Sequence, residues 1–130
     1  MVPTNIPGEA LLFFDGHPGA IPLYLAFDGA VRKAVDVDRV KVQKTQISYY
    51  NRHLFACVSL LPVRKAKDRP RDYITVTLGL DHALESPRVD AVCEPYPGRF
   101  THHLLISSVD EIDEELMDWV KQAADFAGRK

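Results

Sequence analysis

The chain has 130 residues, of which 46% are hydrophobic and 26% charged, so it is long enough to bury one core and too short for two. Its formal net charge of -2 and its pI near 6.2 give no overall signal for binding a polyanion, which leaves only a local basic patch to consider. No segment approaches the roughly 18 uninterrupted apolar residues that a membrane-spanning helix requires, and we expect one soluble domain over residues 1–130.

The N-terminus and the cysteines both favour a cytoplasmic protein. The sequence MVPTNIPGEA has no basic residue before the short apolar run LLFF, a pattern without the marks of a secretory or transit peptide. Cys57 and Cys93 lie in apolar or strand-like stretches, outside any CxxC motif or evenly spaced framework. We therefore expect two reduced thiols with a structural role.

Two helices are predicted before residue 36. Residues 8–14 can form a short helix that ends at Asp15-Gly16, where the following His17-Pro18-Gly19 has the composition of a turn. Between residues 20 and 35, apolar residues recur with helical spacing, at Leu23, Phe27, Ala30, Val31 and Ala34. This spacing predicts an amphipathic helix with one face toward the core.

After residue 36 the pattern changes to the alternation of β-strands. Strands are predicted over 40–42, 47–49, the apolar run 54–61, 73–80 and 100–107, and residues 89–94 fit a short edge strand. Lys44-Thr45-Gln46 interrupts the alternation, which predicts a bend or a bulge within one continuous stretch. Residues 64–71 are too charged for the core and are expected to join two strands of a hairpin.

The C-terminal segment predicts a helix after Ser108. Glu111 stands three residues after Ser108, as in a capping box, and Gly128 is expected to cap the C-terminal end. The apolar stripe consists of Ile112, Leu116, Trp119, Val120 and Ala123. Together these elements predict an α+β fold, an antiparallel sheet of four or five strands flanked by an N-terminal and a C-terminal helix. One sheet face then stays open, and we expect function to reside there.

Three stretches together resemble a bacterial family of domains of unknown function: FFDGHPGAIPLYLAFDGAV, KTQISYYNRHLFACVSL and THHLLISSVDEIDEELMDWVKQAADFA. The layout is similar to that of MmcQ/YjbR-like double-wing domains, in which a histidine or tryptophan before the last strand is followed by an acid-rich terminal helix. Where that group has one aromatic residue, this sequence reads Phe100-Thr101-His102-His103. The resemblance rests on packing and turn motifs; it implies the fold and, for function, the DNA contact proposed for that group.

The strongest local charge signal is a basic loop with one opposing carboxylate, Asp68. Its five cations are Arg64, Lys65, Lys67, Arg69 and Arg71. Such a cluster would gain affinity for a phosphate backbone through counterion release, and it is our candidate nucleic-acid contact. The alternative interpretation is a solvated hairpin loop.

A second hypothesis is a homodimer that buries the open sheet face and forms a small-ligand pocket. Its candidate residues are Tyr49, Arg52, Arg99 and His102. Adjacent strand positions send His102 and His103 to opposite faces, so we expect core or interface imidazoles there and no shared metal. His17, His53 and His82 lie in loops or at strand ends without HxH or HxxxH spacing, and we expect neither a metal nor another cofactor.

No arrangement of nucleophile and base is predicted. Cys57 lies in the core-like run FACVSL and no GxSxG motif occurs, so catalytic residues are not assigned. Three hypotheses stay open, in order of preference. They are a binding module that engages nucleic acid or another protein, the homodimeric ligand-binding domain, and an enzyme of unrecognised class.

Overall fold

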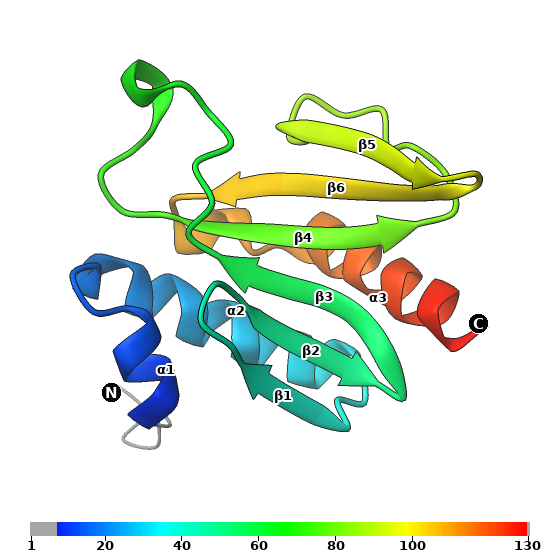
Figure 1. The fold of residues 1–130 in the computed structure, drawn as a ribbon, viewed down its shortest axis with the longest axis horizontal. Helices are drawn as coiled ribbons and strands as arrows, with labels where there is room; N and C mark the ends of the chain where they lie inside the picture. The colour runs from blue at the N-terminus through cyan, green and yellow to red at the C-terminus, as the bar shows by residue number, and fades with distance from the viewer. Residues whose placement is uncertain (1–7, 130) are drawn as a thin grey trace.

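The computed structural model describes residues 8–129, which form one antiparallel sheet with helices at both ends of the chain (Figure 1). The start of the N-terminal stretch discussed above, residues 1–7, lies outside the described residues. Within residues 8–129 the sheet has six strands in the order β1-β2-β3-β4-β6-β5. The strands are β1 Arg39–Val42, β2 Ile47–Asn51, β3 His53–Ser59, β4 Ile74–Leu80, β5 Ala91–Tyr96 and β6 Arg99–Ile106. The helices are α1 Gly8–Phe13, α2 Ile21–Ala34 and α3 Glu114–Gly128, with single 3-10 turns η1 Pro18–Ala20, η2 Ala66–Asp68 and η3 Val109–Glu111.

The α+β class is confirmed, and the strand number expected from the sequence is too low. Lys44-Thr45-Gln46 is the turn of a hairpin, closed by the backbone N–H of Gln43 donating to the carbonyl of Gln46 at 2.8 Å. Val42 pairs with Ile47 on the other side of this turn, so β1 and β2 are two strands. The interrupted alternation therefore marks a reversal of the chain. An irregularity of register does occur, but between β2 and β3, at Tyr49 and Tyr50.

The other predicted strand connections hold. β3 and β4 pair antiparallel across the charged loop, and β5 lies at the edge of the sheet beside β6. The loop between β3 and β4 projects from one end of the sheet (Figure 1). Charged side chains and proline in this segment leave too little apolar surface to bury, so it lies outside the main layers.

Both long helices cover the same face of the sheet, behind it in Figure 1. The predicted stripe of α2 contributes buried Leu23, Phe27 and Val31, and α3 contributes buried Leu116 and Trp119. The sheet meets them with a cross-strand row of buried side chains, namely Tyr49, Ala56, Leu78 and His102. The core thus lies between the helices and this covered face.

The terminal helix begins later than the sequence predicts. The capping box of Ser108 and Glu111 is present, but it starts the 3-10 turn η3. Ile112 leaves helical geometry with ψ 75°, and Asp113 then caps α3 by accepting from the N–H of Leu116 at 3.0 Å. Two successive caps therefore divide the acid-rich segment into a turn and a helix. At the other end Gly128 is the last helical residue, and Arg129 takes the capping position.

The opposite face of the sheet carries no helix across its centre in Figure 1. One end is crossed by the start of the β3–β4 loop, where the hydroxyl of Thr75 donates to the carbonyl of Leu61 at 2.7 Å. α1 lies beside β1, the strand at one edge of the sheet. We call this side of the sheet the open face. Within the described part of the chain, no helix is long and apolar enough to cross a membrane.

Candidate binding groove on the open face

A row of polar side chains crosses the open face at paired positions of four strands. Ser48 pairs with Cys57, Cys57 with Thr77, and Thr77 with His103. The Ser48 hydroxyl and the Cys57 sulfur are 3.9 Å apart, and Thr77 Oγ1 lies 2.9 Å from Nδ1 of His103. Strand alternation places this row opposite the core row, because each polar residue neighbours a core residue along its strand.

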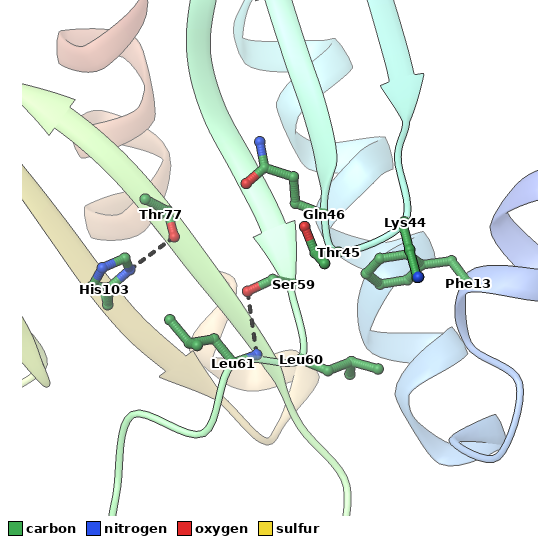
Figure 2. Close-up of a pocket in the computed structure, with 9 residues that line it drawn as sticks. All are labelled: Phe13, Lys44, Thr45, Gln46, Ser59, Leu60, Leu61, Thr77 and His103. Carbon is green, nitrogen blue, oxygen red and sulfur yellow. Dashed lines mark hydrogen bonds between the residues drawn. The ribbon is translucent and has the colours of Figure 1, made fainter.

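Two adjoining cavities lie on this face, and we call them together the open-face groove. The first, of about 440 Å³, is drawn in Figure 2 and extends from α1 and the β1–β2 turn across β3 to β4 and β6. Its lining residues are Phe13, Lys44, Thr45, Gln46, Ser59, Leu60, Leu61, Thr77 and His103. The second, of about 280 Å³, shares Gln46 and Thr77 with the first. Its other lining residues are Leu54, Phe55, Ala56, Cys57, Gly79 and Thr101.

Lys44 and His103 lie at opposite ends of the first cavity. Figure 2 shows Phe13 and Lys44 at one end, Thr77 and His103 at the other, and Gln46 and Ser59 between them. The Lys44 and Thr45 side chains make no hydrogen bond or ion pair within residues 8–129, whereas Gln46 donates to Ser48 Oγ at 2.9 Å. The Lys44 end therefore presents a cation and a hydroxyl for new contacts.

Burial sets the protonation states in the groove. It lowers the pKa of His103 below 6.5, so the imidazole is neutral at physiological pH. Burial likewise raises the pKa of the Cys57 thiol, against a smaller lowering by its contact with Ser48. Because β4 and Thr77 separate Cys57 from His103, this thiol has no adjacent base. The arrangement is suited to hydrogen bonding and packing.

The five cations of the basic loop are not equivalent in the structure. Arg64 donates to Asp90 through Nε at 2.7 Å and Nη2 at 3.4 Å, and Asp90 also accepts from the backbone N–H of Leu105 at 2.7 Å. Arg69 is half-buried, and its Nε has no hydrogen-bond partner in the described part of the chain. The exposed cations are Lys65, Lys67 and Arg71, next to exposed Asp68 and Asp72. Arg64 is thus a structural tie between the loop and β6.

The four residues of the predicted ligand pocket do not come together. Tyr49 is completely buried on the covered face, where its hydroxyl donates to Asp28 at 2.9 Å. His102 is buried on the same face, with β3 and β4 between it and Tyr49. Arg52 occupies the β2–β3 turn with φ +64°, and Arg99 is exposed at the start of β6.

The remaining histidines lie on the surface. His17 and His53 are exposed, and His82 is exposed beside Asp81, with Nδ1 2.7 Å from a carboxylate oxygen. Across residues 8–129 there is no group of three or more histidine, cysteine, aspartate or glutamate side chains arranged to hold a metal ion.

The sequence interpretation missed most of the open-face groove. Of its lining residues, Thr77 and Gln46 were not candidates, although Ser48, Ser59 and the threonines of 73–80 fall on alternate strand positions. Small hydroxyl side chains on every second position of central strands are the signal that could have identified a second, polar face. The strand order that gathers them is not visible in the spacing.

The chain was compared with protein families, curated proteins and solved structures. No curated protein and no solved structure matches it. A family model with the description "Domain of unknown function (DUF5655)" matches residues 12–127, which confirms the expected membership in a family of unknown function. The similarity to the MmcQ/YjbR-like layout stays a prediction. Because the model spans most of the sequence, the chain belongs to the DUF5655 family.

Proposed function

We propose that this protein is a binding module that takes up a small ligand in the open-face groove. The observation that supports the proposal is a cavity of about 440 Å³ on the sheet face opposite α2 and α3, lined by both apolar and hydrogen-bonding side chains. This volume lies in the range of small-molecule sites, about 300 to 1,000 Å³. The homodimeric hypothesis makes a second copy the occupant of the same face.

The lining chemistry supports a ligand with apolar and polar parts. Phe13, Leu60 and Leu61 supply apolar surface, while Thr45 and His103 supply hydrogen-bonding groups. A ligand that packs on the first set and bonds the second would displace water from apolar side chains without losing polar contacts. Phe13 is held by α1, Leu60 and Leu61 by the first residues after β3, Thr45 by the β1–β2 turn and His103 by β6. Folded elements therefore hold the groove in place before any ligand binds.

A small-molecule fragment screen monitored by ¹H–¹⁵N correlation spectra tests the proposal. We expect the shifted amides to cluster at the groove, around Gln46, Leu61 and Thr77. Gly79→Val fills space in the second cavity where an added Cβ meets no atom within 4 Å, so it should weaken binding without unfolding the protein. Gly29→Ala, on the exposed side of α2, is the matched control. Fragments that shift other surfaces, unaffected by Gly79→Val, contradict the proposal. Sedimentation velocity at the same concentrations separates ligand uptake from closure by a second copy.

A second candidate function is sequence-independent contact with nucleic acid through the basic loop. The supporting observation is the exposure of Lys65, Lys67 and Arg71 on a loop that projects from the sheet (Figure 1). Phosphate contacts by these cations would give an affinity that falls steeply with salt. These three residues replace the five predicted from the sequence as the candidate contact, because Arg64 is paired with Asp90 and Arg69 is half-buried.

Anisotropy titrations with short single- and double-stranded oligonucleotides at about 50 mM salt test this candidate. Replacement of Lys65, Lys67 and Arg71 by glutamine should abolish most binding and flatten the salt dependence. The control replaces three exposed lysines elsewhere, Lys33, Lys41 and Lys121, with the same change in net charge. Absence of wild-type binding, or an equal loss in both triple variants, rejects the candidate.

A further inference from the structure

The open-face groove has an uneven distribution of charge, and this carries an inference that rests on the proposed function. Among the described residues that line the first cavity, Lys44, at the end beside Phe13, is the one that is charged at neutral pH, and none carries a carboxylate. The residues of 8–129 that line the second cavity are all uncharged. We infer that the ligand is an elongated small organic anion, with its carboxylate or phosphate at Lys44 and its uncharged body along Gln46 and Thr77.

The Lys44 end of the groove suits an anionic group. The Lys44 side chain is exposed in the β1–β2 turn and forms no ion pair with any described residue, so its charge is not already neutralised. The hydroxyl of Thr45 lines the same cavity and can donate a second hydrogen bond. A cationic ligand would meet an ammonium group here with no carboxylate to offset it, which disfavours that class.

The rest of the groove suits an uncharged body. Leu60 and Leu61 border the path from Lys44 toward Thr77, where the two cavities meet. At the other end of the cavity, the Thr77 hydroxyl forms a hydrogen bond with Nδ1 of His103. Burial lowers the pKa of this imidazole and keeps it neutral, so it places no second charge beside the ligand. A polyphosphate chain would need cations along its length, whereas the described lining residues of the groove supply one, Lys44.

The inference is tested with four probes that each contain a linear chain of six carbon atoms: hexanoate, hexyl phosphate, 1-hexanol and hexylammonium. Dissociation constants come from ¹H–¹⁵N titrations at about 20 mM ionic strength, where screening of an exposed charge is weak. At least one anion should bind about two- to fivefold more tightly than 1-hexanol, within the gain measured for exposed ion pairs, and hexylammonium should bind most weakly. The tighter of the two anions identifies the headgroup. Propionate should bind more weakly than hexanoate if the body contacts the groove.

Lys44→Gln should remove the preference for the anions and leave 1-hexanol binding unchanged, while Lys33→Gln on α2 should change neither. Equal binding of the anions and 1-hexanol, tighter binding of hexylammonium, or no binding of either anion overturns the inference. If fragments still shift groove amides in that case, the proposed function stands. If the fragments and the six-carbon probes all bind away from the groove, both the proposed function and this inference are rejected. Well-dispersed spectra of each variant confirm that it is folded.

Discussion

The imidazole of His102 is completely buried, and both of its nitrogens face backbone polar groups. The N–H of Leu84 donates to Nε2 at 3.0 Å, so the proton of the neutral ring resides on Nδ1, 3.4 Å from the carbonyl oxygen of Leu78. This residue, a candidate ligand contact in the sequence, instead fastens the segment after β4 to β6. A second proton on the ring would occupy Nε2 and break the bond from Leu84.

Acidification is expected to destabilise the fold through His102 and His103. Burial, the largest cause in both, lowers the pKa of each imidazole below the ordinary value of 6.5. The unfolded chain therefore binds more protons as the pH falls through about 6.5, and the free energy of unfolding decreases from there to the folded-state pKa values. Urea denaturation should show a lower midpoint at about pH 5.5 than at about pH 7.5. His103→Gln should reduce this difference, and equal wild-type midpoints would contradict the prediction.

Arg64 is expected to contribute to stability, unlike its neighbours in the basic loop. Arg64→Ala removes two hydrogen bonds to the half-buried Asp90, which should lower the free energy of unfolding by about 1 to 3 kcal/mol. Lys65→Ala, at an exposed position whose side chain forms no ion pair with a described residue, should change it by less than about 0.5 kcal/mol. Chemical denaturation of both variants measures the difference. Similar changes in the free energy of unfolding for the two variants would show that Arg64 does not stabilise the fold and is as available for binding as the exposed cations.

At the scale of elements, α3 anchors the C-terminal part of the chain to the sheet. Trp119 is buried in the α3 interface, and the guanidinium of Arg88 lies 5.6 Å from the centre of its ring. Arg88 also donates to Asp113 at 2.9 Å and to Glu115 at 3.0 Å, which joins the segment before β5 to the start of the helix. Apolar packing and this charged cluster thus act on the same helix.

Trp119→Ala should lower the free energy of unfolding by about 3 to 5 kcal/mol, since it leaves a cavity and removes buried apolar surface. Lys121→Ala, on the exposed side of the same helix, should stay within about 0.5 kcal/mol of wild type. Urea denaturation of both variants provides the comparison. An unchanged midpoint for Trp119→Ala would remove this side chain from the core.

The elements differ in how far the sequence predicts them, for a physical reason. The stripes of α2 and α3 depend on spacing within one helix, so Leu23, Phe27 and Trp119 identify them without knowledge of any partner. The reversal at Lys44-Thr45-Gln46 depends on which strand pairs with which, and alternation alone fits a bulge equally well. The late start of α3 likewise depends on a second cap, at Asp113.

At the scale of the whole molecule, the open-face groove joins segments that are distant in the sequence. Phe13, Lys44, Ser59 and His103 come from α1, the β1–β2 turn, β3 and β6. The sequence predicts that one sheet face stays uncovered, but the residues on it follow from strand order and register, which need the tertiary structure. The density of charge along the sequence instead predicts a binding site at residues 64–71. It cannot show that Arg64 forms an ion pair with Asp90, which is distant in the sequence.

The edge strand β5 also affects whether other copies of the chain can add strands to the sheet at high protein concentration. Its register with β6 shifts between Cys93 and Tyr96, and Pro95 within it has no N–H to offer. An edge of this kind is a poor template for adding strands from other chains, because the row of unpaired amides is short and interrupted. The opposite edge, β1, has four residues, with α1 beside it. Both edges of the sheet are therefore poor starting points for fibril growth.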